Sequence, residues 1–496
     1  MTLKSLIKGI KVAKVTGDVN CEIKGIAYDS RNVKERFLFV AVRGFSTDGH
    51  RYINDALSRG AAGVIVEKEA DLSGICLSCD GAAFATVEDS RDALAAVSSA
   101  FYREPSKGLS LIGITGTNGK TTTSYITKSI LDTWGRKVGL LGTIRYIIGN
   151  RVAAAIHTTP ESLDLQGYLR EMLDNNVEYA VLEVSSHALT LKRVEGCSFK
   201  AAAFTNFTQD HLDFHGTMEE YFTAKAKIFD YVENGGYAVL NWDDPAVRTL
   251  TEKLKCNVIT CGLQEGAMIR GMNIDKAEGR RKKDEKSFFH NSTLIIQPSD
   301  FIIQTPGGEL NISSPLAGRN NVYNILMSVG IAYALGVGDE AIIKGLGEVS
   351  PVEGRFEKID AGQKFLCILD YAHTEDALKR LIEEARLITK GKVITVFGCG
   401  GNRDRDKRHK MGAVAAELSD FVIITSDNPR TENPMWIIND IIAGIKKSNY
   451  MILPDRAEAI IRAVSMTEQG DTLLVAGKGH EDYQEINGIR RPFSDR

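Results

Sequence analysis

Residues Gly113–Thr123 read GITGTNGKTTT, and they decide the fold because a glycine loop here joins an apolar run to a helical pattern. The run LSLIGI (109–114) contains no charge, as expected of a buried strand, and TSYITKSILDTW (123–134) has helical spacing. Glycines let backbone N–H groups approach phosphate oxygens, the helix start adds its positive end, and Lys120 supplies a mobile charge. The stretch therefore predicts a phosphate-binding loop.

This loop departs from the usual phosphate-loop pattern at one position. The pattern places glycine at position 114, which is Ile114 here, and the first loop glycine is Gly116. The alternative is a glycine turn that happens to precede Lys-Thr. The strand before the loop and the helix after it favour the phosphate loop, because the motif requires both.

Apolar runs on either side of the loop indicate an α/β fold with three domains. We expect a small α/β domain over 1–105, which ends at the linker REPSKG (103–108). A central P-loop ATPase-like domain over 106–349 includes a β-rich excursion at 265–315, with runs TLIIQ and FIIQT and the basic insert RRKKDEK. The runs that predict strands in these two domains are FLFVAV (37–42), GVIVE (63–67), VGLLGT (138–143), YAVLEV (179–184), KAAAFTNF (200–207) and YAVLNW (237–242).

A third domain is expected over 350–496, beyond the boundary at Ser350-Pro351. Five apolar runs alternate there with amphipathic helical segments, which is the pattern of a parallel, doubly wound, Rossmann-like sheet. The runs are FLCIL (365–369), KVITVF (392–397), FVIIT (421–425), YMILP (450–454) and TLLVA (472–476).

Composition excludes several classes of protein. The 496 residues are 43% hydrophobic and 25% charged with a formal net charge of −3, so nothing draws the chain to nucleic acid or an anionic membrane. Lysines interrupt the first residues too often for a signal peptide, and no run is long enough to span a membrane. The eight cysteines are scattered, and Cys76 and Cys79 form a C-x-x-C pair with no second pair at zinc spacing. We expect a reduced, cytoplasmic protein.

Several motifs together resemble the Mur ligases, which are ATP-dependent enzymes that build the peptide of bacterial cell-wall precursors. GTNGKTT (116–122) carries the resemblance with YDSR (28–31), GRNNVYN (318–324), DNPR (427–430) and FSDR (493–496), so that nearly the whole chain is covered. The resemblance implies that ATP converts a substrate carboxylate into an acyl phosphate, which an amine then attacks. Such chemistry needs Mg²⁺ at the phosphates and cations for the developing charge.

The resemblance also implies which residues bind ATP and metal. Thr121, Glu183 and His211 are the expected Mg²⁺ ligands, with Lys225 as a fourth, and Lys120, Glu183, His211 and Lys225 are the expected catalytic residues. His215 and His187 are expected to be structural. The expected ATP-binding residues are Gly116, Thr117, Asn118, Gly119, Lys120, Thr121, Thr122, Asn321, Asn324, Arg355 and Asp370. Asn321 and Asn324 are three apart and would share a helical face.

Lys225, in FTAKAKIF (222–229), matches a lysine that the family carries as a carbamate formed with CO₂. Carbamylation turns the cation into an anion that can help hold Mg²⁺, since hard cations prefer oxygen ligands. The alternative, which the amphipathic pattern alone would favour, is a solvated surface lysine.

The carboxylate substrate implied by the resemblance is UDP-MurNAc-L-Ala-D-Glu. Its uridine diphosphate end is expected at Ser30 and at Asp48, Gly49 and His50, and its muramoyl-dipeptide at Thr158, Thr159, Ser185 and Arg193. Two departures from the family pattern are Leu191, where some relatives have glutamine, and Glu375, where proline is common. The second should change the start of the following helix more than the chemistry.

Four polar clusters follow strands of the third domain: Asp370 to His373, Gly400 to Arg403, Asp427 to Arg430, and Gly477 to Glu481. Ligands collect outside the carboxyl ends of strands in a doubly wound sheet, so these clusters predict a site. DNPR is the form that the diaminopimelate-adding members of the family carry. We expect meso-2,6-diaminopimelate, with carboxylates at Arg403 and Arg430, an ammonium at Asp427 and Glu481, and contacts from Asn428, Pro429 and Gly477. The alternative is an Asx-Pro turn with an exposed arginine.

Rival functions remain within and outside the enzyme class. A lysine-adding ligase would not need DNPR, and a folylpolyglutamate synthetase would not need the YDSR and DGH segments. A nucleotide-dependent switch would need neither Lys225 nor DNPR, and no guanine-reading N-K-x-D occurs. We expect a monomer that works on small-molecule substrates.

Overall fold

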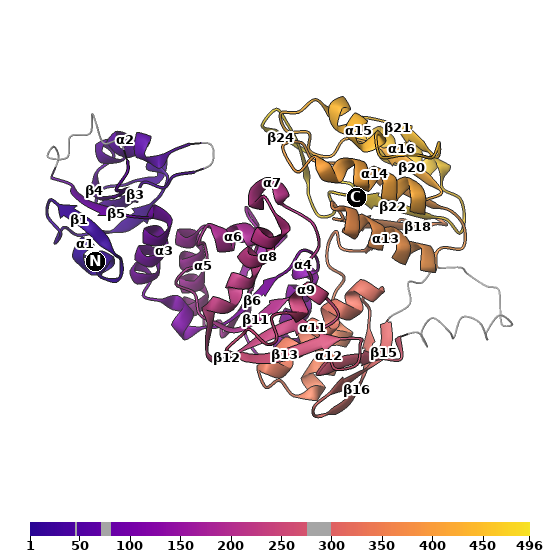
Figure 1. Cartoon of the computed structure of the whole chain (residues 1–496), viewed down its shortest axis with the longest axis horizontal. Coiled ribbons are helices and arrows are strands. Elements are labelled where there is room, and N and C mark those ends of the chain that lie inside the picture. The colour runs from indigo at the N-terminus through magenta and orange to yellow at the C-terminus, as the bar shows by residue number, and fades with distance from the viewer. Residues whose placement is uncertain (45–46, 71–80, 275–298) are drawn as a thin grey trace. The chain divides into compact units, whose positions relative to one another are not determined.

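The computed structural model describes residues 1–44, 47–70, 81–274 and 299–496 (Figure 1). Three large sheets of five, eleven and six strands confirm the predicted three-domain α/β architecture, whereas the exact bounds 1–105, 106–349 and 350–496 stay a prediction. No helix within the described ranges is long and apolar enough to cross a membrane. The runs TLIIQ and RRKKDEK and the Cys76–Cys79 pair lie outside the described residues.

The chain forms two compact units, each assembled from several segments. The first unit comprises Met1–Thr115, Gly135–Ala202 and Ala224–Ala238, and the second comprises Gly116–Trp134, Ala203–Thr223 and Val239–Arg496.

A five-stranded sheet in the order β1-β5-β4-β3-β2 belongs to the first unit. Its inner strands are buried on both faces, since Leu38 and Val40 pack in one apolar cluster and Phe39 packs in another. Burial on both faces requires uninterrupted apolar runs, which explains FLFV and GVIVE. The elements are α1 (Leu3–Leu6), β1 (Val12–Thr16), β2 (Gly25–Ala27), η2 (Ser30–Asn32), β3 (Phe37–Val40), η3 (Gly49–Tyr52), α2 (Ile53–Ser58), β4 (Ala61–Glu67), β5 (Ala83–Val87) and α3 (Ser90–Phe101).

The central sheet has the order β16-β15-β14-β13-β12-β11-β6-β10-β7-β8-β9. β10 (Tyr179–Glu183) lies between β6 (Ser110–Thr115) and β7 (Val138–Leu141), and all three are parallel. The antiparallel pair β15–β16 confirms the β-rich excursion in its described part. The other elements are α4 (Lys120–Thr133), β8 (Arg145–Ile148), β9 (Arg151–Ala154), α5 (Ser162–Asp174), α6 (Ser186–Thr190), β11 (Phe199–Phe204), α7 (Leu212–His215), α8 (Met218–Ala226), β12 (Val232–Asn241), α9 (Pro245–Arg248), β13 (Asn257–Gly262), β14 (Ile269–Met272), β15 (Ser299–Thr305), β16 (Gly308–Ser314), α11 (Arg319–Ala334) and α12 (Asp339–Glu348).

The six-stranded sheet has the order β17-β18-β22-β19-β20-β21, and its last five strands are parallel, as predicted. These strands coincide with the five apolar runs read from the sequence. The elements are β17 (Glu357–Ile359), β18 (Leu366–Asp370), α13 (Glu375–Ile388), β19 (Val393–Phe397), α14 (Asp406–Leu418), β20 (Phe421–Ile424), α15 (Pro434–Ile442), β21 (Tyr450–Ile452), α16 (Arg456–Met466), β22 (Thr472–Ala476), β23 (Tyr483–Ile486) and β24 (Ile489–Pro492).

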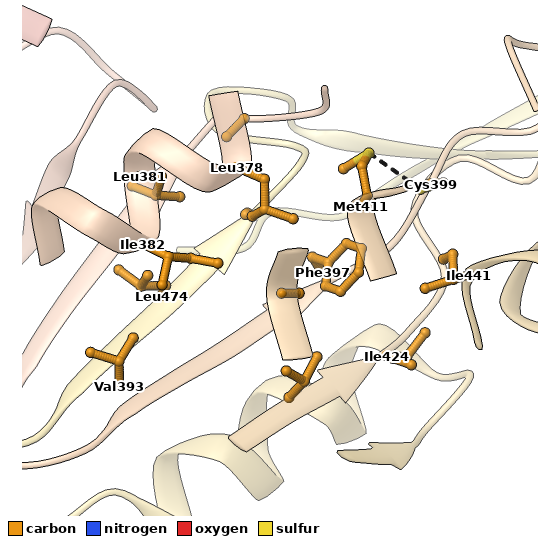
Figure 2. Close-up of a cluster of buried hydrophobic side chains, with 14 of the residues drawn as sticks. Leu378, Leu381, Ile382, Val393, Phe397, Cys399, Met411, Ile424, Ile441 and Leu474 are labelled. Carbon is orange, nitrogen blue, oxygen red and sulfur yellow. Dashed lines mark hydrogen bonds between the residues drawn. The ribbon is translucent and has the colours of Figure 1, made fainter. Parts of the chain in front are cut away.

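Helices cover both faces of this sheet, which makes it doubly wound. On one face α13, α14 and α15 bury a cluster around Phe397 and Leu474 (Figure 2). Leu378, Leu381 and Ile382 of α13 belong to it, at the spacing of a single helical face. On the other face Ala459 and Ala463 of α16 pack against Val396 and other strand residues. Apolar packing thus leaves the polar residues of this domain at the strand ends.

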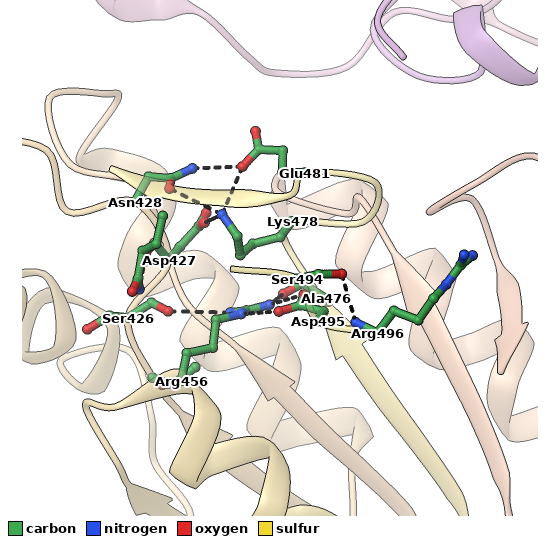
Figure 3. Close-up of polar contacts among 12 residues, drawn as sticks. Ser426, Asp427, Asn428, Arg456, Ala476, Lys478, Glu481, Ser494, Asp495 and Arg496 are labelled. Atoms are coloured by element: carbon green, nitrogen blue, oxygen red, sulfur yellow. Dashed lines mark hydrogen bonds and ion pairs between the residues drawn. The ribbon is translucent and has the colours of Figure 1, made fainter. Parts of the chain in front are cut away.

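A fully buried ion pair fixes the segment after β24. Asp495 accepts two hydrogen bonds of 2.6 Å from Arg456, one from Nε and one from Nη2, and both side chains are 0% exposed. Arg456 Nη2 also donates to the carbonyl of Ala476 at the end of β22, at 2.9 Å (Figure 3). The pair therefore ties the last described residues to the carboxyl edge of the sheet.

Replacing Asp495 by asparagine should destabilise this domain, because the Arg456 guanidinium would stay buried without its counter-charge. Losing one partner of a buried pair costs about 3 kcal/mol or more, which is about 150-fold in a local opening equilibrium. Hydrogen exchange of the β20 and β22 amides should accelerate by that factor. The exposed Asp482→Asn is the matched control and should change stability by less than about 0.5 kcal/mol. Equal exchange in the two variants would contradict the assignment.

Candidate functional site

The predicted glycine loop lies between β6 and α4, and its glycines are required by close packing. Gly116 and Gly119 have φ of 143° and 84°. A Cβ at Gly116 would lie 1.9 Å from Thr205 Oγ1, and one at Gly119 would lie 2.4 Å from Asn324 Oδ1. Position 114 lies within β6, which explains why it is isoleucine and why the first loop glycine comes two residues later. The strand, the loop and the helix are all present as predicted.

The segment after β11 holds this loop in shape. Asn206 Oδ1 accepts from Asn118 N at 2.9 Å, and its Nδ2 donates to Asn118 O at 3.0 Å. Thr205 Oγ1 donates to the same carbonyl at 2.6 Å. Thr117 Oγ1 donates to Thr208 O at 3.1 Å. The sequence reasoning missed Thr205 and Asn206, although their place directly after the predicted strand KAAAF was a signal.

Lys120 begins α4, and its Nζ donates to the carbonyls of Gly116 and Thr117 at 2.9 and 3.0 Å. Thr121 and Thr122, on the first turn of the same helix, are buried. The ammonium therefore lies against the loop whose N–H groups were expected to face phosphate.

Expected nucleotide residues from distant parts of the second unit meet at α4. Arg355 Nη2 donates to Thr121 Oγ1 at 3.2 Å. Asn324 Nδ2 donates to Asn321 Oδ1 at 3.1 Å, so the two asparagines share a face of α11 as predicted. Asp370 ends β18 and accepts from the backbone N–H groups of Phe356 and Ala372, at 2.6 and 2.7 Å. Burial raises the pKa of Asp370.

Glu183 ends β10 and is fully buried. It lies opposite Ile114 in the parallel register between β10 and β6, so the strand that leads into the glycine loop is its neighbour. Thr143 holds the carboxylate with its N–H at 3.0 Å and its hydroxyl at 2.8 Å. Gly142 must be glycine, because a Cβ there would lie 2.2 Å from Glu183 Oε1. Sequence reasoning missed Thr143.

The expected dipeptide residues lie around Glu183 in the first unit. Thr159 Oγ1 donates to Glu183 O at 2.8 Å and accepts from Ser185 N at 3.1 Å. Thr158 Oγ1 lies 3.1 Å from the hydroxyl of Thr143. Arg193 Nη1 donates to Thr159 O at 3.0 Å. Leu191, at the family's glutamine position, directly follows α6.

Arg193 also has an internal carboxylate that the sequence reasoning missed. Its Nη2 lies 2.7 Å from Glu161 Oε1, and both side chains are largely buried. Its guanidinium is thus already engaged by the protein.

His211 and Lys225, the remaining expected metal ligands, belong to different units. His211 Nε2 lies 3.3 Å from Asp210 Oδ2. Burial alone would raise the pKa of Asp210, but His211, Lys407 and His373 hold it well below its usual value. Lys225 is 1% exposed at the end of α8, which contradicts the solvated-surface alternative. Among the residues the structure describes, no group of three or more His, Cys, Asp or Glu could hold a metal.

The polar groups of the DGH segment form hydrogen bonds with one another and with the neighbouring strand β4. His50 Nε2 accepts from Glu67 N at 3.0 Å, so its proton lies on Nδ1, 2.6 Å from Asp48 Oδ1. Gly49 must be glycine, because a Cβ would lie 2.7 Å from the Val42 backbone. Ser30 is buried in η2. Both η2 and η3, which contains Gly49 and His50, pack on α2. The structure thus groups Ser30 and DGH around one helix.

The cluster DNPR follows β20 and is not an exposed turn, since its first three residues are buried and Arg430 is half-buried. Arg430 has φ of 53°, a conformation held by the β23–β24 hairpin, since its N donates to Glu485 O at 3.0 Å and its O accepts from Asn487 N at 2.6 Å. Its Nη1 donates to Gly401 O at 2.7 Å, in the cluster after β19. Gly401 N in turn donates to Asn428 O, one residue before Pro429. All four predicted clusters therefore meet, since Asn428 Nδ2 also donates to Glu481 Oε2 at 2.8 Å and Gly477 N donates to Asp370 O at 3.0 Å.

The charges around this cluster are unevenly paired. Neither Arg403 nor Arg430 forms an ion pair with a described residue, and Arg403 is exposed. Asp427 and Glu481, which were expected to face a substrate ammonium, lie 3.6 and 3.0 Å from the ammonium of Lys478. Gly477 has φ of 111° and lies beside Asp427, since a Cβ there would be in van der Waals contact with Oδ2 at 3.7 Å. Sequence reasoning missed Lys478, although it stands inside GKGHE.

Comparisons with known proteins cover nearly the whole chain. Three family descriptions match: "Mur ligase family, catalytic domain" at residues 22–102, "Mur ligase middle domain" at 114–332 and "Mur ligase, glutamate ligase domain" at 354–479.

Two curated relatives carry the name UDP-N-acetylmuramoyl-L-alanyl-D-glutamate–2,6-diaminopimelate ligase. The protein from Caldanaerobacter subterraneus subsp. tengcongensis is 42% identical over 498 residues, covering 100% of this chain and 98% of its own length. The protein from Alkaliphilus metalliredigens is 42% identical over 500 residues, covering 100% and 96%. A solved structure of a protein with the same name has a TM-score of 0.65 at 29% identity, covering 100% of this chain and 97% of that chain.

Proposed function

The chain belongs to the Mur ligase family, and from that membership we propose that it joins 2,6-diaminopimelate to UDP-N-acetylmuramoyl-L-alanyl-D-glutamate. The observation that carries the proposal is the likeness, at 42% identity over the full length, to ligases named for that reaction. The reaction would extend the precursor of peptidoglycan, on which cell shape and division depend.

ATP supplies the activation in this proposal. The substrate carboxylate attacks the γ-phosphorus of ATP, ADP leaves, and the amine then displaces phosphate from the acyl phosphate. Residues Gly116–Thr122 would hold the phosphates, with the Lys120 ammonium facing the charge that develops on transfer. Asn321, Asn324, Arg355 and Asp370 would bind the rest of the nucleotide. The contact between Arg355 and Thr121 supports this grouping.

The donor set fits Mg²⁺, which prefers oxygen ligands. Glu183 is a buried carboxylate whose two oxygens are steered by Thr143, and Thr121 offers a hydroxyl at the loop. His211 and the carbamate of Lys225 would complete the set, and the burial of Lys225 supports the carbamate. When bound, the ion would neutralise charge on the phosphates.

The dipeptide substrate would lie along the first unit. Its uridine diphosphate end is assigned to Ser30, Asp48, Gly49 and His50, and its muramoyl-dipeptide to Thr158, Thr159, Ser185 and Arg193. Because Arg193 already pairs with Glu161, its role would include holding Thr159 through the backbone carbonyl.

The amino-acid half of the site supports meso-diaminopimelate. Arg430 and Arg403 have no carboxylate partner among the described residues, so their charges suit the carboxylates of a diamino diacid. L-lysine lacks the second carboxylate and would leave an arginine unmet, at a cost of about 2–5 kcal/mol, or tens to thousands of fold in affinity. All substrates are small molecules, and we propose a cytoplasmic monomer that needs neither a membrane nor nucleic acid.

One assay tests the whole proposal. Purified protein receives ATP, Mg²⁺, the UDP-linked dipeptide and one amino acid at a time, and ADP and UDP-tripeptide are measured. Diaminopimelate should support tripeptide formation. Turnover with lysine but not diaminopimelate would overturn the choice of amino acid. ATP hydrolysis that ignores the dipeptide would overturn the ligase and favour a nucleotide switch.

Arg430→Met should lower kcat/KM for diaminopimelate by about 100-fold, because the far carboxylate loses its counter-charge. The residual turnover of lysine should change less than threefold. Arg462→Met, an exposed arginine of α16, is the matched control and should behave like wild type. An equal loss of activity with diaminopimelate and with lysine would mean that Arg430 maintains the loop conformation and does not bind the second carboxylate.

A further inference from the structure

A buried ammonium lies at the centre of the proposed amino-acid site. Lys478 follows β22, and its side chain is 0% exposed. Its Nζ donates to Asn428 Oδ1 at 3.1 Å and to Glu481 Oε2 at 3.0 Å, and lies 3.6 Å from Asp427 Oδ1 (Figure 3). The lysine therefore links the loop after β20 to the loop after β22, although β19 lies between these strands.

These contacts fix the orientation of the Asn428 amide. Its Oδ1 accepts from both Lys478 Nζ and Glu485 N, the latter at 2.9 Å. Its Nδ2 must therefore face the other way, and it donates to Glu481 Oε2 at 2.8 Å. That oxygen thus receives two donors, which turns the other oxygen of Glu481 away from the lysine.

Acceptors are left over on both carboxylates. Asp427 is 7% exposed, and its Oδ1 has no hydrogen-bond donor. Glu481 Oε1 likewise has no hydrogen-bond partner among the described residues. A buried acceptor without a donor is costly, so such atoms point to a ligand that brings N–H groups.

Charge leads to the same conclusion. Asp427, Glu481 and Lys478 together carry one net negative charge, which matches one ammonium group of an incoming amino acid. Without the lysine, two buried carboxylates would repel each other, and their positions would no longer be fixed.

We propose that Lys478 is a positioning residue of the amino-acid site, which turns one oxygen of Glu481 toward the substrate ammonium and balances the charge of Asp427 beside it. The proposal rests on the proposed function, since it assumes that an amino acid binds beside DNPR. Lys478 does not itself contact the substrate. Its orienting bonds to Asn428 and Glu481 are the means by which it acts.

Lys478→Met tests this, because methionine fills a similar volume without the ammonium. In the full-length enzyme the KM for diaminopimelate should rise at least 30-fold, while the KM values for ATP and for the UDP-dipeptide stay within twofold. Lys447→Met removes an exposed lysine from the same domain, and its kinetics should match wild type. A purely structural role would raise all three KM values or lower the melting temperature without this selectivity.

A double variant provides a second, independent test of the positioning role. If Lys478 acts through Glu481, Lys478→Met in a Glu481→Gln background should raise the KM for diaminopimelate by less than fivefold further. This pair also removes one carboxylate together with the ammonium, so it should melt close to Glu481→Gln even if Lys478→Met alone fails to fold.

Two results would overturn the positioning role. One is a KM for diaminopimelate within threefold of wild type in folded Lys478→Met, and the other is a further 30-fold rise in the Glu481→Gln background. Failure of the proposed function has a different signature, since wild type would then turn over another amino acid instead. The same comparison made with that amino acid would still decide the role of Lys478.

Discussion

Lys120→Ala is expected to lower kcat by about a thousandfold, which corresponds to about 4 kcal/mol of lost transition-state stabilisation. The ammonium begins α4 and lies 2.9 and 3.0 Å from the carbonyls of Gly116 and Thr117, inside the loop proposed to hold the phosphates. Phosphoryl transfer spreads negative charge over the transferred group, so the missing cation should weaken the transition state more than the bound ATP. Single-turnover measurements of ADP formation would separate this loss from substrate binding.

The same helix provides the control. Lys128 lies two turns further along α4 and pairs with Asp132 at 2.6 Å. Lys128→Ala should leave kcat within threefold of wild type, and both variants should melt near the wild-type temperature. Comparable losses in the two variants would show that α4 tolerates no alanine, and the phosphate-loop assignment would lose its support.

Lys225→Ala is expected to be nearly inactive, with a loss of at least a hundredfold in kcat that a small added carboxylate partly restores. In the proposal the lysine nitrogen adds to CO₂ and loses a proton, which leaves a carbamate that takes part in holding Mg²⁺. Formate or acetate could then occupy the space that the shortened side chain leaves. Activity as a function of formate concentration is the measurement.

Lys227 lies two residues away and is exposed, so Lys227→Ala is the matched control and should keep full activity with no response to formate. Full activity of Lys225→Ala would remove the carbamate from the mechanism. An inactive variant that no carboxylate restores, with an unchanged melting temperature, would leave the side chain essential but not as a carbamate.

The sequence predicts the individual strands of the C-terminal sheet, but not their order. Each apolar run from FLCIL to TLLVA is long enough to be recognised as a buried strand. The position of β22 between β18 and β19 follows from how three strands pack in space, and no local pattern encodes it. The start of α13, by contrast, can be explained from the local sequence, although Glu375 stands there in place of the proline that is common in the family. Thr374 caps α13 there, and Glu375 occupies its first turn, where a negative charge is favourable.

The candidate site shows the same division. GTNGKTT indicates a phosphate loop because it lies between a strand and a helix, and DNPR indicates an amino-acid cluster because it follows a strand of a doubly wound sheet and matches the form seen in the family. The sequence did not reveal which protein residues pair with the site residues when the two lie far apart in the chain. Glu161 beside Arg193 and Asn206 beside Asn118 are examples, since their roles depend on contacts that only the folded chain creates.

The central position of β22 has a consequence for synthesis of the chain. Thr472 pairs with Leu366 of β18 on one side and with Val393 of β19 on the other. A ribosome delivers β18 to β21 first, so the nascent domain exposes two unpaired strand edges until β22 inserts between them, and such edges are prone to aggregation. Lys478 follows β22 by two residues. β22 is the last strand of this sheet to be made, so its insertion closes the sheet and brings the buried ammonium to the loop after β20 in one event.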